Sequence, residues 1–311
     1  MDNETINPDN EISALSSSYI RLLGIFTGMG FSLNIIIGSG IFATPGDVWR
    51  LTGSPIIALM FFVLGGLISF LGCLIYAELG SMLPRGAGEL RYLEEAYPNK
   101  KIIAHGFSIA MLTYQGANAF YSTINRNDTP VEQIGGYGDA MMKVLYAYEG
   151  WNNVNYLIDE LESPRRNLKF SNIFSTITAI ILYILINIAY VMVLNPNDAT
   201  INSTGNASHV IAISFGDSLD KNIGKQLISA FIAISSFGAV SSMCFTGARI
   251  IVYSSLSGFI PEYFAKWSFL FNTPTRALFA QFIYCSTLIM LFPTGRESIL
   301  NKTQYISKVL Y

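Results

Sequence analysis

Long apolar blocks without a single charged residue are the feature that most limits how this chain can fold. Four of them are secure: Leu22–Gly46, Pro55–Ala77, Ser171–Leu194 and Gln226–Ala248. An α-helix needs about 20 apolar residues to cross the hydrocarbon core of a bilayer, and each block supplies them. The sequence therefore predicts an all-α, polytopic membrane protein.

Three more segments are weaker candidates for membrane spans. Ala277–Gly295 is uncharged but short, and Ile102–Asn125 is uncharged but carries several polar side chains. Met141–Leu157 is interrupted by Lys143 and Glu149, so hydropathy alone would reject it. With these included, the prediction is about seven spanning segments.

Composition excludes several classes of function. Charged residues make up 13% of the chain, against about 25% in soluble domains, and the formal net charge is -2. There is no basic stripe, so a nucleic-acid partner is not predicted. Cys73, Cys244 and Cys285 lie in apolar blocks without paired spacing. This pattern is typical of small buried residues rather than of a metal site or a disulfide framework.

The sequence does not predict an enzyme. His105 and His209 are the only histidines, and the chain has neither an H-E-x-x-H nor a G-x-S-x-G motif. Glu160 and Glu162 stand beside Pro164 at a predicted span end and are interpreted as solvated or helix-end charges. No motif predicts a cofactor or a metal ion.

Basic residues near span ends give the predicted orientation, because loops rich in lysine and arginine stay in the cytoplasm. They occur in three loops, within Arg85–Lys101, Arg165–Lys169 and Lys266–Arg276. Placing these loops inside puts the N-terminus in the cytoplasm. Residues 1–20 lack the pattern of a cleavable signal peptide and are predicted to be a disordered cytoplasmic tail. Residues 21–311 are predicted to form a single transmembrane domain.

The loop after Ser171–Leu194 then falls on the outer side. It carries two N-glycosylation sequons, at Asn202 and Asn206. Sequons are common by chance, so these give mild support for a glycoprotein. They favour a secretory route that ends in the plasma membrane or an endomembrane.

The first apolar block contains a segment that breaks its own helix. Gly38-Ser39-Gly40 lies near its middle, and two glycines in three residues weaken a helix by roughly 1 kcal/mol each. In hydrocarbon, such a break persists only where it is buried or lines a polar cavity. Its free N–H groups would suit a carboxylate and its free carbonyls an ammonium, so one break can hold both ends of an α-amino acid. The alternative is close helix packing, which Gly24 and Gly28 also favour.

A second interruption lies in the Met141–Leu157 segment. Ala147–Asn153 is polar and contains a glycine, and Glu149 lies at membrane depth. An ionisable residue at such depth indicates a functional site by default. Two discontinuous spans in corresponding places of two halves are typical of the binding site of a secondary transporter. The alternative is an interfacial loop with a belt of aromatic residues.

A set of motifs, in order along the chain, resembles the L-type amino acid transporters of the amino acid–polyamine–organocation superfamily. The resemblance runs from about Gly24 to Gly295. The motifs are Gly38–Phe42, Pro84–Glu89, Ala147–Asn152, Glu160–Leu168, and Gly247–Arg249 with Gly258–Pro261.

The resemblance implies a LeuT-like fold, in which two inverted five-helix repeats make up the first ten of twelve spans. It implies that the substrate carboxylate meets the backbone N–H groups of Ser39 and Gly40. The ammonium would meet carbonyls near Ile37 and at Tyr146 and Ala147. The substrate side chain would extend toward Tyr146 and Glu149. The predicted substrate-binding residues are Ile37, Gly38, Ser39, Gly40, Tyr146, Ala147, Glu149 and Gly150.

Glu149 stands where the large-neutral members of this family have glycine and some relatives have an acidic residue. Three roles stay open for it. It could favour cationic substrates, carry a coupling proton, or serve as a structural partner for a hydroxyl group.

The chain departs from the family pattern between Thr113 and Asn118. There it passes from the middle of the third span to the loop before the sixth, so spans four and five are predicted to be missing. Spans eleven and twelve are predicted to be absent as well. The prediction is therefore a partial LeuT-like fold and an incomplete transporter domain. Some relatives bind a heavy chain through a disulfide, but no cysteine stands in the corresponding stretch, so that partner is not predicted.

The first functional hypothesis is an exchanger or permease (an antiporter in the case of exchange) for L-amino acids, neutral and, through Glu149, cationic. The second is a binding or regulatory membrane protein in which the site survives but alternating access does not. The missing spans favour the second hypothesis, and the motif set favours the first.

Overall fold

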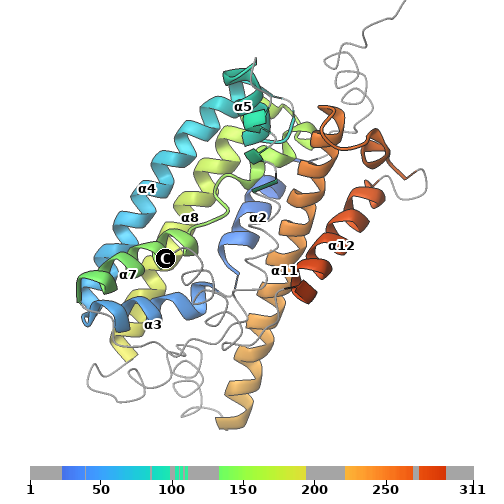
Figure 1. Ribbon diagram of the computed structural model, residues 1–311. Helices are drawn as coiled ribbons and strands as arrows, with labels where there is room; N and C mark the ends of the chain where they lie inside the picture. The colour runs from blue at the N-terminus through green and yellow to red at the C-terminus, as the bar shows by residue number, and fades with distance from the viewer. Residues whose placement is uncertain are drawn as a thin grey trace, which may run out of the picture. The chain divides into compact units, whose positions relative to one another are not determined.

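The computed structural model describes residues 23–38, 40–84, 86–98, 102–104, 106–107, 109–110, 133–193, 221–268 and 273–291. In this part of the chain the regular structure is helical (Figure 1), which confirms the predicted all-α fold. The α-helices are α2 (Ile25–Ile36), α3 (Gly40–Thr52), α4 (Pro55–Met82), α5 (Glu89–Ala96), α7 (Gln133–Ala147), α8 (Pro164–Val193), α11 (Lys221–Leu256) and α12 (Thr275–Leu291). Two 3-10 helices are η1 (Asn153–Glu160) and η2 (Glu262–Ala265).

The chain divides into two compact units. The larger unit comprises Asp9–Tyr92 and Pro130–Met243, so it contains both predicted helix breaks. The smaller unit comprises Met1–Pro8, Leu93–Thr129 and Cys244–Tyr311. The prediction of a single domain over residues 21–311 stays a prediction.

Three helices in the described part of the chain are long and apolar enough to cross a membrane. They run over Pro55–Met82, Pro164–Met192 and Ala230–Leu256. They correspond to three of the four secure blocks, and each helix continues past its uncharged stretch at one end or both. The extensions carry polar and charged residues such as Glu78 and Lys169, which form an exposed ion pair of 2.6 Å. Helix ends of this kind project from the hydrocarbon into water.

The other predicted spans need correction in their bounds. Leu22–Gly46 is not one helix, because it is split between α2 and α3, and α3 continues to Thr52. Met141–Leu157 is likewise split between α7 and η1. Ala277–Gly295 begins two residues earlier than predicted, in α12.

Several predictions lie outside the described residues. These are the tail at residues 1–20, the sequons at Asn202 and Asn206, and His209. Only a few residues at the start of Ile102–Asn125 are described, and these are helical.

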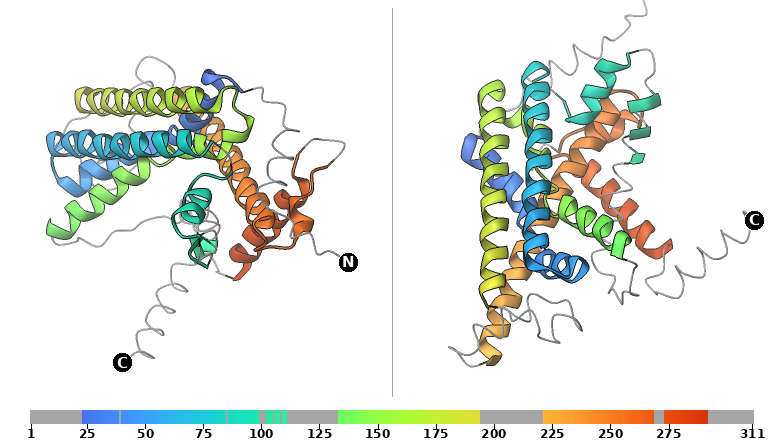
Figure 2. Two further views of the ribbon diagram at one scale, coloured as in Figure 1. Left: turned by 90° about the horizontal axis from the view of Figure 1, so that it is seen from above. Right: turned by 90° about the vertical axis from the view of Figure 1, so that its left-hand side faces the viewer.

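Helices α4 and α8 pack along each other in the larger unit, and α2 packs on α8 (Figure 2). Small residues permit this approach: a Cβ atom on Gly28 of α2 would lie 2.6 Å from the Ser171 hydroxyl of α8. The outer side of α4 is apolar and open, with Ile56 70% and Leu71 61% exposed. An exposed apolar face of this kind is expected where a helix contacts lipid.

A short backbone pairing ties the start of the first broken span to the end of the second. The Leu23 N–H donates to the Glu160 carbonyl (3.1 Å), and the Glu162 N–H donates to the Leu23 carbonyl (2.9 Å). The two broken spans are therefore joined at these two ends.

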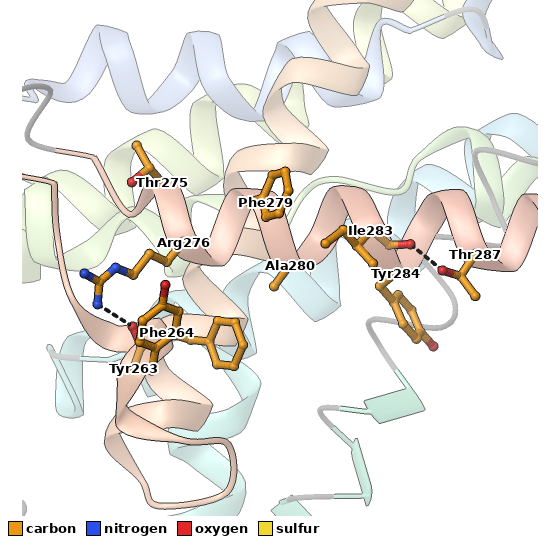
Figure 3. A pocket seen from close by; sticks show the side chains of 9 residues that line it. All are labelled: Tyr263, Phe264, Thr275, Arg276, Phe279, Ala280, Ile283, Tyr284 and Thr287. Carbon is orange, nitrogen blue, oxygen red and sulfur yellow. Dashed lines mark hydrogen bonds between the residues drawn. The ribbon is translucent and has the colours of Figure 1, made fainter.

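In the smaller unit, Arg249 of α11 is buried between two aromatic rings. Its guanidinium carbon lies 5.1 Å from the Phe245 ring centroid and 5.0 Å from that of Trp267. A pocket in the same unit is lined by residues of α12 and by Tyr263 and Phe264 of η2 (Figure 3). There Arg276 lies 4.2 Å from the Tyr263 ring centroid and donates to the Tyr263 carbonyl (3.3 Å). None of the predicted substrate-binding residues that the structure describes lines this pocket.

Candidate functional site

The first break falls where the sequence predicts it. Helix α2 ends at Ile36, and the Ile37 N–H still donates to the Leu33 carbonyl (2.7 Å). The Gly38 N–H bends back to the Ile35 carbonyl (3.3 Å), and α3 begins at Gly40. Ser39 lies outside the described residues. The last carbonyls of α2 and the first N–H groups of α3 lack partners within their own helices, as at every helix end.

The second break also falls within its predicted segment. Helix α7 ends at Ala147, residues 148–152 form a turn, and η1 begins at Asn153. Gly150 has φ of +120°, a backbone conformation that L side chains rarely adopt. The glycine therefore permits the turn.

The two breaks lie against each other at Gly150. A Cβ atom built there would lie 2.8 Å from Cγ2 of Ile35 and 3.1 Å from Cγ1 of Ile36. Real Cβ atoms essentially never approach other atoms so closely. The backbone of the second break thus packs directly on the last turn of α2. Gly150 has a packing role, in addition to any contact with substrate.

A tyrosine from α8 stands between the carbonyls of the two breaks. The Tyr183 hydroxyl lies 2.8 Å from the Ala147 carbonyl oxygen and 3.2 Å from the Ile36 carbonyl oxygen. Its side chain is fully buried. The carbonyl ends of α2 and α7 therefore converge on one hydroxyl group. Of the predicted residues, Ala147 and Gly40 lie next to it, since a Cβ on Gly40 would lie 3.6 Å from the same hydroxyl.

Aromatic side chains hold this tyrosine in place. The Tyr183 ring lies 5.4 Å from Phe62 and 4.8 Å from Tyr148, measured between centroids. The Tyr148 hydroxyl donates to the Phe62 carbonyl (3.1 Å). Buried rings with satisfied polar ends fix the position of their neighbours.

Helix α11 contacts the first break from another side. The Ser235 hydroxyl donates to the Ile37 carbonyl, and a Cβ on Gly38 would lie 3.2 Å from Cβ of Ala239. One turn earlier, the Asn34 amide donates to the Gly238 carbonyl (2.7 Å) and to the Ser242 hydroxyl (2.9 Å). Gly38 therefore also serves close helix packing, which is the alternative interpretation of the Gly38–Gly40 segment.

Tyr146 and Glu149 differ from the other predicted residues. The Tyr146 side chain is 44% exposed, and its carbonyl accepts the Glu149 N–H of the turn (3.1 Å). Glu149 is partly buried. The Tyr146 side chain is therefore only partly enclosed by the protein. The sequence interpretation missed Tyr183 and Ser235, although both are polar residues inside apolar blocks.

An ion pair links the half-helices α3 and α7, which pack side by side (Figure 1). Lys143 Nζ lies 3.2 Å from Asp47 Oδ2, and the two side chains are only 18% and 20% exposed. This explains how Lys143 is tolerated in a span that hydropathy would reject. Paired charges on facing helices can be held at membrane depth, where a single charge is costly.

We expect the Asp47–Lys143 pair to contribute a coupling energy of about 1–2 kcal/mol, between the values for exposed and fully buried pairs. Lys143→Met and Asp47→Asn should each destabilise the protein. The double variant should lose less stability than the two single variants lose together. Thermal unfolding in detergent measures this cycle. The exposed pair Glu78–Lys169 is the matched control, with coupling below about 1 kcal/mol. Additive effects at Asp47 and Lys143 would contradict the account.

Glu89, in the motif after α4, is buried beneath the second break. The Asn152 amide donates to its Oε1. Burial raises the pKa of Glu89, and hydrogen bonds from Tyr156, Asn152 and Tyr76 offset this only in part. Burial therefore disfavours the charged carboxylate relative to the neutral carboxyl.

This raised pKa predicts a pH dependence of stability. A carboxyl whose pKa is higher in the folded state stabilises the fold below its unfolded pKa of about 4.3 and loses that contribution as the pH rises through the folded pKa. The unfolding temperature of the wild type should fall over this window, and Glu89→Gln should flatten the fall. Glu78→Gln, at an exposed carboxylate, is the control and should leave the slope unchanged. Equal slopes for Glu89→Gln and the wild type would refute this role.

The matching family model and three relatives are all named as permeases or transporters. The family model described as amino acid permease matches residues 23–124 and 102–309. The high-affinity methionine permease of Saccharomyces cerevisiae is 25% identical over 390 residues, which cover 96% of this chain and 67% of that protein. The b(0,+)-type amino acid transporter 1 of Mus musculus is 25% identical over 373 residues, covering 95% and 75%. The large neutral amino acids transporter small subunit 2 of Mus musculus is 25% identical over 369 residues, covering 93% and 68%.

The alignments also bear on the predicted gap. Each is longer than the 311 residues of this chain, so each relative has aligned positions without a counterpart here. The two family matches overlap at residues 102–124, around the jump predicted between Thr113 and Asn118. Both observations agree with an internal shortening of the transporter core. The family match spans most of the chain and confirms the resemblance, so the chain belongs to the amino acid permease family, within the amino acid–polyamine–organocation superfamily.

Proposed function

We propose that this chain binds L-amino acids where its two helix breaks meet and carries them across a membrane as a secondary transporter. The observation that carries the proposal is the convergence of the Ile36 and Ala147 carbonyls on one buried point, at the Tyr183 hydroxyl. Carbonyl ends of two half-helices create a negative potential that suits an ammonium group.

The carboxylate of the same ligand is assigned to the start of α3. The first N–H groups of this helix, from Gly40 onward, have no intrahelical partner, and the helix dipole favours an anion there. Gly40 lets the ligand approach the backbone because it has no side chain. Ser39 and Gly38 complete the proposed segment, and Ile37 contributes its carbonyl. An α-amino acid carries both groups on one carbon: an ammonium for the carbonyls and a carboxylate for the N–H groups of α3.

The proposed substrates are neutral L-amino acids first and cationic ones second. The similar proteins are named for methionine, for large neutral amino acids and for b(0,+)-type transport. Glu149, partly buried at the second break, supports a cationic side chain by its charge. Its two other roles, as a proton carrier or as the partner of a hydroxyl, compete with this one.

A second candidate function is binding without transport, and the internal shortening favours it. In that case the junction of the breaks survives, but the missing helices leave no second set of contacts for alternating access. A regulatory or sensing membrane protein would result.

Uptake and binding measured on the same protein separate the two functions. Purified full chain in liposomes should bind radiolabelled L-methionine and accumulate or exchange it across the bilayer. Liposomes without protein and a chain carrying Gly40→Leu are the controls. Binding without uptake would remove the transport proposal and support the second candidate. Absence of both for L-methionine, L-leucine and L-lysine would overturn the proposed site.

The membrane placement belongs to the same proposal. We place the N-terminus in the cytoplasm and the chain in the plasma membrane or an endomembrane. Protease protection of an N-terminal tag in sealed vesicles of known orientation tests this.

A further inference from the structure

We infer that the pocket lined by α12 and η2 binds an anionic phospholipid, with the lipid phosphate at Arg276 and an acyl chain along α12. The inference goes beyond the proposed function, because it holds whether or not the chain transports amino acids. The pocket lies wholly within the smaller unit, so it does not depend on how the two units are arranged.

The pocket is polar at one end and apolar along its length. Thr275 and Arg276, at the start of α12, form the polar end together with Tyr263 of η2 (Figure 3). Phe279 and Ile283 follow on the same face of the helix, about one and two turns further on. A molecule with a charged head and an apolar tail matches this order.

The size and openness of the pocket suit part of a lipid. Its volume is about 690 Å³, and its lining side chains Tyr263, Phe279 and Ile283 are 58%, 64% and 50% exposed. Pockets for small molecules measure about 300–1,000 Å³, so this one can hold a lipid headgroup and the first carbons of a chain. The rest of the chain would extend along the exposed apolar face of α12, as expected for a helix that contacts lipid.

Arg276 supplies the positive charge of the pocket. Of the nine lining residues it is the charged one. Its guanidinium carbon lies 4.2 Å from the Tyr263 ring centroid, and its Nη1 donates to the Tyr263 carbonyl (3.3 Å). Neither contact neutralises the charge, and a guanidinium has five N–H donors. It can therefore keep both contacts and still bind two phosphate oxygens.

The predicted place of the pocket in the membrane agrees with this ligand. The loop Lys266–Arg276 is one of the three basic loops predicted to face the cytoplasm. The cytoplasmic leaflet carries anionic lipids, and basic pockets beside membrane helices bind their headgroups. Tyr263 and Trp267 are residues of the kind that lie at the level of the headgroups. The start of α12 is thus where the phosphate of such a lipid would lie.

Native mass spectrometry of the full chain in detergent, titrated with phosphatidylserine or with phosphatidylcholine, tests the inference. The wild type should bind phosphatidylserine about fivefold more tightly, since one basic residue at a membrane surface contributes about that factor. Arg276→Gln should abolish the preference, and Arg276→Lys, which keeps the charge, should retain most of it. Ala280→Phe should weaken binding of both lipids, because the larger side chain fills the apolar part of the pocket.

Arg166→Gln is the matched control. Arg166, near the start of α8, also lies over an aromatic ring, 5.9 Å from the Phe170 centroid, but it does not line this pocket. The lipid preference should be unchanged in this variant. An unchanged preference in Arg276→Gln, or an equal loss in Arg166→Gln, would overturn the inference.

Two other occupants of the pocket would also be detected. Glycerophosphoserine has the headgroup without acyl chains, and it should compete only weakly with the whole lipid. Competition at the affinity of the lipid would overturn the inference, because the pocket would then bind a soluble phosphate ester. A mass spectrum with dimers in place of lipid adducts would overturn it in favour of a second copy of the chain.

A measurement on the wild type applies should Arg276→Gln fail to fold. Phosphatidylserine with a photoreactive diazirine in its acyl chain is bound and irradiated, and the labelled peptides are identified. The label should lie within residues 277–287 of α12, and unlabelled phosphatidylserine should displace it better than phosphatidylcholine does. A label on other segments alone, or equal displacement by the two lipids, would contradict the inference.

Discussion

Gly150→Ala is expected to destabilise the protein by about 2–6 kcal/mol, a large part of the stability of a folded chain. Two costs add at this position. An L residue at φ of +120° is strained by about 1–3 kcal/mol. The new methyl group would also lie 2.8 Å from Cγ2 of Ile35, so α2 and the second break must separate, at a further cost of about 1–3 kcal/mol. Thermal unfolding in detergent, together with the yield of monodisperse protein, measures the loss.

Gly53→Ala is the matched control for Gly150→Ala. Gly53 also has a positive φ, of +67°, but a Cβ there meets nothing within 4 Å. Gly53→Ala introduces backbone strain without a steric clash, so it should destabilise the protein by about 1–2 kcal/mol. If the two substitutions cost the same, the close contact between the breaks does not exist as described.

Gly40→Leu is expected to abolish binding of L-amino acids, with a loss of at least about a hundredfold, without unfolding the chain. A Cβ fits at Gly40, since its nearest neighbours would be 3.6 and 3.7 Å away. The remaining atoms of leucine would extend beyond these neighbours and block the approach of a ligand to the backbone of α3. Gly40→Ala should therefore fold and bind with an intermediate loss. Equilibrium binding of radiolabelled L-methionine measures both variants.

Gly30→Leu provides the control for the effect of a leucine in the same broken span. Gly30 of α2 is exposed, and a Cβ there meets nothing within 4 Å. Binding should be unchanged in this variant. Normal affinity in Gly40→Leu would remove the proposed site from the first break.

The sequence predicts correctly those features that depend only on residues within one segment. An uncharged block of 20 or more residues can only be a span or a buried helix, so Pro55–Ala77, Ser171–Leu194 and Gln226–Ala248 were identified correctly. Glycines within a span weaken its helix, so the break at Gly38–Gly40 was predictable too. The ends of the helices were less predictable, because hydropathy marks only the apolar stretch of a helix, and polar residues such as Glu78 continue the helix beyond it.

Lys143 illustrates what a single segment cannot reveal. On hydropathy it argues against a span, but Asp47, 96 positions away in the sequence, pairs with it. Its tolerance depends on the packing of α7 against α3, which no local pattern contains. Gly150 is a second example. A glycine is required there because of the contact with Ile35 and Ile36 as much as because of the positive φ.

Tyr183 was missed, although the sequence contained a signal for it. Polar residues recur at spacings of three, four or seven positions along Ser171–Leu194, and such a stripe lies on one face of a helix. The structure buries this face: Tyr183 bonds Ile36 and Ala147, and further along α8 the Tyr190 hydroxyl donates to the Phe42 carbonyl (3.1 Å). The buried polar members of the stripe are Asn172, Thr176, Tyr183, Asn187 and Tyr190.

The account's central claim is that the two breaks form one site for both charged ends of an amino acid. Its most direct test is binding of L-methionine to the wild-type chain in competition with L-methionine methyl ester and N-acetyl-L-methionine. The ester lacks the carboxylate that α3 would bind, and the acetylated compound lacks the ammonium that the Ile36 and Ala147 carbonyls would bind. We predict that L-methionine binds and that neither blocked analogue displaces it at a hundredfold excess. Displacement by either analogue as effective as that by L-methionine itself would contradict the claim.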